Sequence, residues 1–244
     1  MRNLLITLRF DGSAYHGFQV QQNAVSICEQ FQNAVEKIFE IRYNIKGCSR
    51  TDAGVHAEMF CLSMKIDSDI PTENLMRALN TALPYDIAVT AVRDVPDDFH
   101  ARYSCIYKTY RYIIYNAPHK DPFRPTRVYH YPRPLDVELL DTCARDFEGK
   151  HDFSAFCAAG SSVKDTVRHV KYAKVFRLGD DVVFEVCADG FLYNMVRIMA
   201  GTLLDIAQGK LLSDAVPGII KSRDRNAAGK TAPARGLYLY HVEY

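Results

Sequence analysis

The order in which strand-like and helix-like patterns follow one another most constrains the fold of this chain. Alternating apolar residues predict a strand over residues 4–10, and a run with one apolar face predicts a helix from Ser26. Strand patterns then flank residues 47–57, a second helix is predicted from Thr72, and a further strand is predicted over residues 87–95. This β-α-β-β-α-β order is a split βαβ unit, so we expect the first half to be ferredoxin-like.

The second half repeats this order with one additional helix. Five prolines within residues 117–134 predict an irregular excursion there. The regular elements that we expect are a strand over 106–115, a helix from Asp136 closed by Gly149, a hairpin of strands over 168–178 and 182–188, helices over 192–208 and from Ser213, and a strand over 237–244.

Two such halves predict an α+β fold of two tandem ferredoxin-like domains, residues 1–98 and residues 99–244. The sheet should be largely antiparallel, with the helices on one face. The other face, with a central cleft between the halves, would then offer the natural place for a binding site.

Composition places the chain among ordinary globular proteins. With 244 residues, 48% of them hydrophobic and 24% charged, it can bury a sizeable core. No run of about 18 apolar residues occurs, so we expect no membrane span. Seven cysteines without a Cys-x-x-Cys pair, and histidines without His-Glu-x-x-His spacing, favour reduced thiols and no metal. The N-terminus enters strand-like sequence at once, and we expect a cytoplasmic protein.

Charge is unevenly distributed along the chain despite a net charge of +1. Residues 100–133 contain seven lysines or arginines against one acid, and residues 197–235 contain seven against three. If both stretches fold onto one face, that face would suit a polyanion such as nucleic acid. The alternative is that these charges are scattered over solvated surfaces. The charge pattern alone leaves both interpretations open.

Residues 47–57 hold the densest group of chemically active side chains. An arginine, an aspartate and a histidine occur there within seven residues, and Gly47 and Gly54 bracket Arg50 and Asp52. Glycine permits positive φ angles and close approach of another backbone, so the loop can bend sharply. Loops between strands often display reactive side chains, although an ordinary polar turn would have a similar sequence.

Six short motifs follow one another over nearly the whole chain. They are Tyr15-x-Gly17-x-Gln19, Arg50 to Ala57 (Arg-Thr-Asp-Ala-Gly-Val-His-Ala), Asp97 to Arg102 (Asp-Asp-Phe-His-Ala-Arg), Tyr110-Arg111-Tyr112, Met195-Val196-Arg197, and Thr231 to Leu237 (Thr-Ala-Pro-Ala-x-Gly-Leu). In this order they resemble the TruA family of tRNA pseudouridine synthases. Such a series of matches is far more specific than any one motif.

The resemblance implies conversion of uridine to pseudouridine in tRNA, without a cofactor and with Asp52 as the catalytic carboxylate. A nucleophilic carboxylate can divide the breaking and rejoining of the base into easier steps. Attack on the sugar, attack on the base and removal of a sugar proton all stay open. The resemblance also makes Arg197 the ion-pair partner of Asp52, and it places the ring of Tyr110 against the target uracil. Without it, Tyr110 would be interpreted as a core aromatic residue in a strand. Arg197 could then be a surface charge on a helix, although the apolar residues around it favour a buried partner.

Other residues are expected to bind substrate. Arg50 would contact the backbone of an extruded nucleotide, since chemistry on a base requires its removal from the stack. Phe99 and His100 would hold the displaced RNA by stacking, although each could instead be a packed or solvated side chain. Basic residues over 102–133, beginning with Arg102, and over 223–235 are candidates for a tRNA phosphate track. His56 is interpreted as a support for the loop.

The resemblance further implies a homodimer in which one subunit positions the tRNA, and modification of the anticodon stem-loop at its 3′ side. Ser49 and Phe18 depart from the residues usual in the family, glycine and tryptophan, and leave the choice of uridines open. A catalytically silent tRNA-binding or RNA-chaperone protein is the first alternative. A glycoside or nucleoside hydrolase is the second, although glycosidases usually need two carboxylates.

Overall fold

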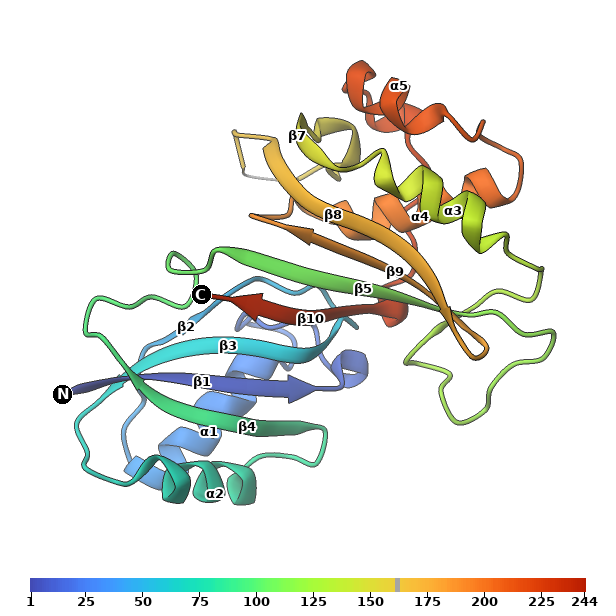
Figure 1. Cartoon of the computed structure of the whole chain (residues 1–244). Coiled ribbons are helices and arrows are strands. Elements are labelled where there is room, and N and C mark those ends of the chain that lie inside the picture. Colours follow the sequence, from blue (N-terminus) through green and yellow to red (C-terminus); the bar gives the residue numbers. More distant parts are fainter. Residues whose placement is uncertain (161–162) are drawn as a thin grey trace. The chain divides into compact units, whose positions relative to one another are not determined.

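The computed structural model describes residues 1–160 and 163–244 and divides the chain into two compact units (Figure 1). Unit 1 comprises Met1–Ile106 with Leu239–Tyr244, and unit 2 comprises Tyr107–Tyr238. The expected domain boundary after residue 98 therefore differs from the boundary between these units, and the end of the chain lies with unit 1. A division into two domains stays a prediction.

The first four strands of unit 1 follow the predicted order, and they are β1 (Arg2–Phe10), β2 (Ile45–Gly47), β3 (His56–Ile66) and β4 (Ile87–Val95). Most of β10 (Leu237–Glu243) also belongs to unit 1, although the sequence predicts this strand as part of the second half. Their spatial order is β4-β1-β3-β10, with β2 paired to β3, and β1 is antiparallel to β3 and to β4. Because side chains alternate along a strand, Leu4, Ile6 and Leu8 of β1 point to one face, where all three are fully buried.

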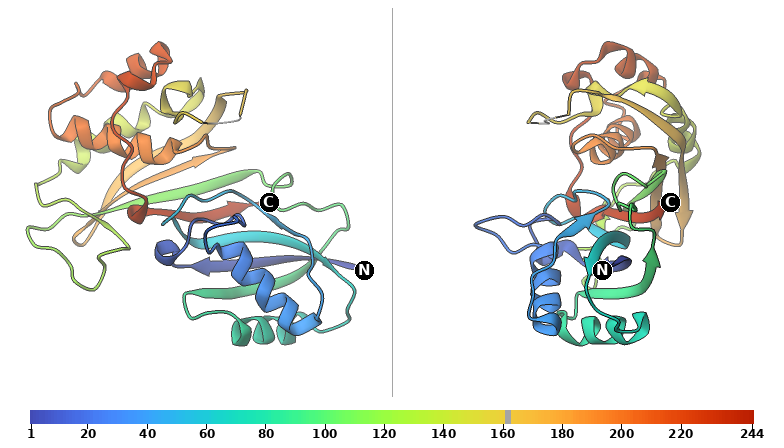
Figure 2. Two further views of the ribbon diagram at one scale, coloured as in Figure 1. Left: turned by 180° about the vertical axis from the view of Figure 1, so that it is seen from behind. Right: turned by 90° about the vertical axis from the view of Figure 1, so that its left-hand side faces the viewer.

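Two helices cover that buried face of unit 1. They are α1 (Ile27–Phe39) and α2 (Thr72–Ala82), which pack against each other and lie on the same side of the strands (Figure 2). Helix α1 begins at Ser26, whose hydroxyl accepts a hydrogen bond from the N–H of Glu29 while the Glu29 carboxylate accepts one from the N–H of Ser26. This capping box satisfies two backbone donors at the start of the helix.

The second face of β1 and β3 is covered by the chain that follows β4. The Asn3 amide donates to the carbonyl oxygens of Pro96 and Phe99, each at 2.9 Å, and the Ser63 hydroxyl accepts from the N–H of Ala101 at 3.1 Å. The Tyr244 hydroxyl donates to the Ala101 carbonyl at 2.9 Å. These bonds explain why residues 99–106 and the last residues belong to unit 1.

Unit 2 contains a second, largely antiparallel set of strands. They are β5 (Tyr107–Tyr115), β6 (Tyr129–His130), β7 (Gly149–Asp152), β8 (Val167–Leu178) and β9 (Asp181–Ala188). The order is β5-β9-β8-β7, and the short β6 runs parallel to β5. The α+β class and the antiparallel pairing are as predicted. The irregular excursion over 117–134 is interrupted by β6, and Gly149 begins a strand instead of closing a helix.

The helices of unit 2 are α3 (Val137–Arg145), α4 (Met195–Ala207) and α5 (Ala215–Ser222). Helix α3 packs on β8, and α4 packs on β5 and on α3. Leu140 and Cys143 of α3 are buried, whereas Leu139 is exposed. Helix α4 begins three residues later than expected because Asn194 adopts a left-handed conformation with φ of 61°. Among the described residues, no helix is long and apolar enough to cross a membrane.

A buried carboxylate in unit 2 makes its stability depend on pH. Glu185 on β9 is 3% exposed, and its oxygens accept from Arg111 Nε at 2.6 Å and pair with Lys174 Nζ at 2.9 Å. Burial opposes ionisation, but the hydrogen bonds from Lys174 and Arg111 prevail and hold the pKa of the Glu185 carboxyl below its ordinary value. A lowered pKa stabilises the folded state above the unfolded-state pKa, and this contribution disappears as the pH falls through the folded-state pKa.

Glu185→Gln is therefore expected to lower the free energy of unfolding by about 1.5–3 kcal/mol at pH 7, because it weakens two hydrogen bonds to charged groups. The cost should shrink as the pH is lowered from 7 to 3, because the contribution of the carboxylate is lost as the pH falls through the lowered folded-state pKa. Urea denaturation at both pH values measures this. Glu58→Gln, which breaks an exposed pair with Arg9, should cost less than about 1 kcal/mol. An equal loss at both pH values would contradict the assignment.

Candidate functional site

The loop between β2 and β3 carries Asp52, whose side chain is half-buried. The backbone turns tightly there, because the Asp52 carbonyl accepts from the N–H of Val55 at 3.2 Å and Gly54 has a φ of 75°. Arg50 precedes this turn and is exposed to solvent. The loop therefore presents a carboxylate at the protein surface with an arginine two residues away.

Backbone hydrogen bonds from the motif at residues 15–19 hold this turn in place. The N–H of Gly54 donates to the Tyr15 carbonyl at 3.1 Å, and the N–H of Phe18 donates to the Thr51 carbonyl at 3.3 Å. A side chain at Gly17 would begin 2.2 Å from the Thr51 carbonyl oxygen, so the two backbones approach as closely as glycine allows. The Asp52 loop is thus fixed at both ends of its turn.

Gly17→Ala is expected to lower the free energy of unfolding by roughly 2–4 kcal/mol, through a φ of 84° and the clash with the Thr51 carbonyl oxygen. Gly179→Ala is the matched control, because Gly179 also has a positive φ but no atom within 4 Å of the added carbon. Guanidinium denaturation of both variants compares the clash with the strain alone. If the two variants lose the same stability, the proposed close contact is wrong.

His56 supports the loop from the core. Its ring is 1% exposed, and Nδ1 lies 3.1 Å both from the Asp11 carboxylate and from the N–H of Gly12. A histidine enclosed in this way has no open path to a substrate, which agrees with its interpretation as a structural residue.

The two departures from the family pattern lie beside the loop. The Phe18 ring stacks on Phe60 with centroids 4.2 Å apart, and a side chain at Gly47 would begin 2.5 Å from the Phe18 ring. Phe18 is therefore a buried part of the support. Ser49 is half-buried, and its hydroxyl donates to the Arg50 carbonyl at 3.4 Å.

Unit 2 contains Tyr110 and Arg197. Tyr110 lies on β5, is 6% exposed, and meets the Phe191 ring edge-on with centroids 4.9 Å apart. Arg197 lies in the first turn of α4, where its Nε donates to the Ala232 carbonyl at 2.8 Å and its Nη1 donates to the Asn194 side-chain oxygen at 2.7 Å. Two hydrogen bonds therefore fix the plane of the guanidinium.

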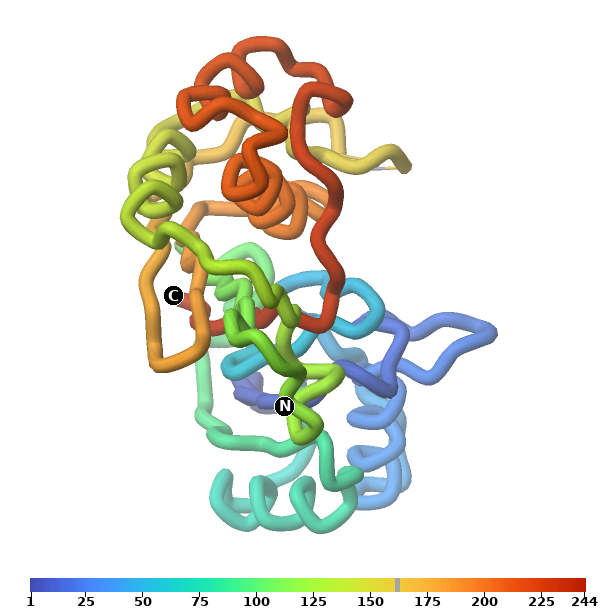
Figure 3. Tube along the Cα trace, turned by 90° about the vertical axis from the view of Figure 1, so that its right-hand side faces the viewer, coloured from blue at the N-terminus to red at the C-terminus, as the bar shows by residue number. Residues whose placement is uncertain are grey.

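The segment over residues 229–236 holds this arrangement in place as it passes α4 (Figure 3). The N–H of Ala232 donates to the Arg197 carbonyl at 3.0 Å, and a side chain at Gly201 would begin 1.6 Å from the Lys230 carbonyl oxygen. Burial raises the pKa of the Tyr112 hydroxyl, which donates to the Pro233 carbonyl at 2.9 Å. The last sequence motif is thus the backbone that orients Arg197.

Three contacts in this part of the site were not predicted, although Ala232 itself belongs to a motif of the sequence. The Phe191 ring packs on Tyr110. The Asn194 side chain and the Ala232 carbonyl hold Arg197. No periodic pattern marks any of these three residues. Asn194 did carry a signal, because asparagine before an apolar helical run is a common helix start.

The other predicted substrate-binding residues lie in unit 1. The Phe99 ring packs 5.0 Å from the Tyr244 ring, so part of its surface is used internally. The His100 Nδ1 accepts from the N–H of Arg102 at 3.1 Å, and its ring lies 4.4 Å from the exposed Tyr103 ring. Arg102 is itself exposed, with its guanidinium carbon 5.8 Å from the Tyr103 ring centre.

Several arginines of the predicted phosphate track are engaged within unit 2. Arg111 pairs with Glu185 at 2.6 Å, Arg124 with Asp121 and Asp181 at 2.7 Å each, and Arg223 with Asp152 at 3.1 Å. Arg225 donates to the Gly229 carbonyl at 3.0 Å and to the Thr231 hydroxyl at 3.2 Å. The charge count in the sequence therefore overstates the positive charge available to a polyanion.

Tyr110 and Arg197 lie in unit 2. Asp52, Arg50 and the segment from Phe99 to Arg102 lie in unit 1. Unit 1 thus holds a half-buried carboxylate on a loop fixed by hydrogen bonds, and unit 2 holds a guanidinium whose plane is fixed. That Asp52 pairs with Arg197 and shares one site with Tyr110 stays a prediction.

Comparison with known proteins identifies the kind of enzyme. A sequence model of the family described as tRNA pseudouridine synthase matches residues 6–104 and 143–244. The tRNA pseudouridine synthase A of Ruminiclostridium cellulolyticum is 44% identical over 245 residues, and that of Thermoanaerobacter sp. (strain X514) is 45% identical over 244 residues, with 100% of each chain covered. The chain belongs to the tRNA pseudouridine synthase family, whose activity is that of an isomerase.

Solved structures are also similar to the chain, among them a crystal structure of a Cbf5-Nop10-Gar1 complex. The alignment with it covers 99% of this chain and 58% of the solved chain, with 12% identity and a TM-score of 0.39. A similarity of this size does not bear on function.

Proposed function

We propose that this chain isomerises uridine to pseudouridine in tRNA, with Asp52 as the nucleophilic carboxylate acting on an extruded uridine. The observation that carries this is the full-length similarity to proteins named tRNA pseudouridine synthase A. The reaction breaks the N-glycosidic bond, turns the uracil and rejoins it through carbon 5. A carboxylate on a braced loop suits such a reaction, because it can form and release a covalent species without moving.

Arg197 and Tyr110 complete the proposed site. Arg197 would pair with Asp52 and keep it ionised and aligned, a task for which a guanidinium held by Asn194 and Ala232 is already oriented. Tyr110, packed on Phe191, would offer its ring to the target uracil.

Arg50 and the His100–Arg102 segment would bind the displaced strand. Arg50 is exposed beside Asp52 in the sequence and would contact the backbone of the extruded nucleotide. His100 and Arg102, grouped with the exposed Tyr103 ring, offer stacking surfaces and positive charge for RNA. Phe99 would contribute less, since it packs on Tyr244.

We further infer modification of the anticodon stem-loop at its 3′ side, a homodimer, and a cytoplasmic location. These rest on family membership, since tRNA is long enough for one subunit to hold its body while another acts on the stem-loop. Analytical ultracentrifugation of the free protein tests the dimer.

Pseudouridine mapping of bulk tRNA, treated with and without the purified protein, tests the activity. New pseudouridines in the anticodon stem-loop are the expected result. Unchanged RNA with retained binding would instead favour a catalytically silent tRNA-binding protein, and release of free uracil would favour a hydrolase. Either of these outcomes would overturn the proposal.

A further inference from the structure

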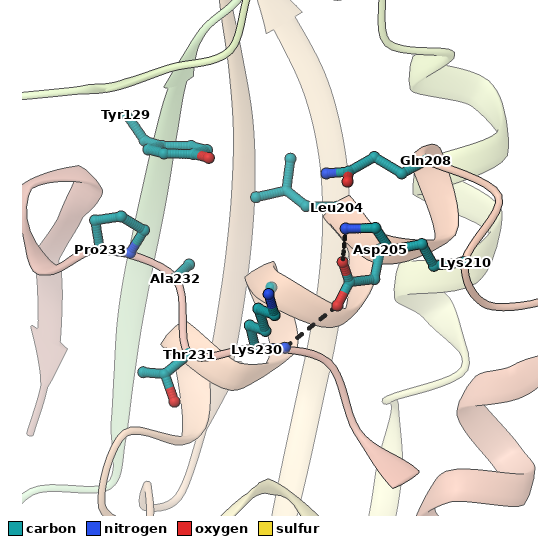
Figure 4. Close-up of a pocket in the computed structure, with 10 residues that line it drawn as sticks. Tyr129, Leu204, Asp205, Gln208, Lys210, Lys230, Thr231, Ala232 and Pro233 are labelled. Carbon is teal, nitrogen blue, oxygen red and sulfur yellow. Dashed lines mark hydrogen bonds and ion pairs between the residues drawn. The ribbon is translucent and has the colours of Figure 1, made fainter. Parts of the chain in front are cut away.

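A pocket of about 290 Å³ lies in unit 2 between α4 and the segment over residues 229–236. Figure 4 shows Tyr129 and Pro233 on one side of it and Leu204 and Gln208 on the other. Lys210 also lines it. Neither Tyr110 nor Arg197 is among its lining residues, so it is distinct from the position proposed for the target uracil.

Close contacts hold the walls of this pocket together. The Lys230 carbonyl oxygen lies where a side chain at Gly201 would begin, and the N–H of Lys230 donates to the Asp205 carboxylate at 3.3 Å. Ala232 lines the pocket and is also bonded in both directions to Arg197. A ligand would therefore enter a preformed space and lose little binding energy to rearrangement.

Charge within the pocket favours an anion at its rim. Asp205 is the acidic lining residue, and its carboxylate pairs with the Lys210 ammonium at 3.3 Å as well as with the Lys230 backbone. Lys210 and Lys230 are both exposed. The guanidinium carbon of Arg235 lies 5.8 Å from the centre of the Tyr129 ring. Lys210 and Asp205 offset each other, so Lys230, together with the Arg235 guanidinium next to Tyr129, leaves this part of the pocket positive.

The remaining walls suit a flat, heteroaromatic group. The Tyr129 ring offers a stacking surface, Pro233 and Leu204 offer apolar contact, and the Gln208 amide can both donate and accept hydrogen bonds. An aromatic surface, an amide and a positive rim are together the features by which proteins bind nucleotides.

We propose that this pocket binds a second nucleotide of the RNA substrate, one that is not isomerised. Its base stacks on Tyr129 and bonds to the Gln208 amide, and its phosphate lies near Lys210 and Lys230. This inference rests on the proposed function. The pocket contributes to substrate choice, because only an RNA able to place an unpaired nucleotide there gains the contact.

The test measures the affinity of the full-length protein for tRNA by fluorescence anisotropy, which requires no turnover. Gln208→Trp, which fills the pocket, and Tyr129→Leu, which removes the stacking ring, should each weaken binding roughly tenfold, the effect of losing one base–aromatic stack. Tyr129→Phe keeps the ring and should bind like wild type. Tyr240→Leu alters a partly exposed tyrosine on β10 and is the matched control.

Saturation-transfer NMR with free AMP and UMP forms the second arm. Wild-type affinity for tRNA in both pocket variants would overturn the inference, and nucleotide signals that vanish in Gln208→Trp would then mark a site for free nucleotides. A loss of turnover without loss of affinity would also overturn it, since it would indicate disturbance of Arg197 through Ala232. Failure of the proposed function is a separate result, namely wild-type protein that binds tRNA and forms no pseudouridine.

Discussion

Asp52→Asn is expected to abolish isomerisation while leaving tRNA binding largely intact. Asparagine fits the same half-buried position, but its amide is not a nucleophile, so a step that needs the carboxylate stops. Loss of a nucleophile typically lowers the rate by at least about 10⁴-fold. Tritium release from tRNA labelled at uracil carbon 5 measures the turnover, and fluorescence anisotropy measures the binding.

Glu58→Gln provides the control for Asp52→Asn, because Glu58 is an exposed acid on the adjoining strand β3. It should retain wild-type turnover. Wild-type-like tritium release by Asp52→Asn would refute the assignment of the nucleophile. Equal loss of turnover and of tRNA binding would point instead to a collapsed loop, which the melting temperature would reveal.

Arg197→Lys is expected to lower kcat by about 10²-fold, the usual cost of misplacing a catalytic group by about 1 Å. Lysine keeps the positive charge but cannot bond in one plane to both the Ala232 carbonyl and the Asn194 side chain. The ion pair proposed for Asp52 would therefore lose its alignment and not its charge. Single-turnover tritium release at saturating tRNA isolates this step from binding.

Two further variants serve as comparisons for Arg197→Lys. Arg223→Lys, which changes an exposed arginine paired with Asp152, should keep wild-type kcat. Asn194→Ala removes one of the two bonds that hold the guanidinium and should give an intermediate loss. If kcat of Arg197→Lys is unchanged and only KM rises, Arg197 binds tRNA and does not position Asp52.

The elements most readily predicted from the sequence are those specified by nearby residues. The strand over residues 87–95 has the predicted bounds, and the hairpin around residues 179–181 and the helix start at Ser26 occur where expected. Each depends on alternation, on a glycine turn or on a side-chain cap, which act within a few residues. These local patterns predict the same element in any fold that buries its apolar face.

Elements that depend on distant partners were not predicted. Residues 99–106 belong to unit 1 because Asn3 and Ser63, far away in the sequence, bond to their backbone. No local pattern within residues 99–106 reveals these partners.

The sequence by itself determined the α+β class, the motifs of the family and Asp52 as the candidate carboxylate, because residue type and short spacing carry that information. Only the tertiary structure decided how the motifs are used. Residues Tyr15 to Phe18 fix the Asp52 turn by backbone hydrogen bonds, and the segment from Gly229 to Gly236 orients Arg197. The physical reason is that backbone hydrogen bonds and close glycine contacts join segments without regard to their separation along the chain.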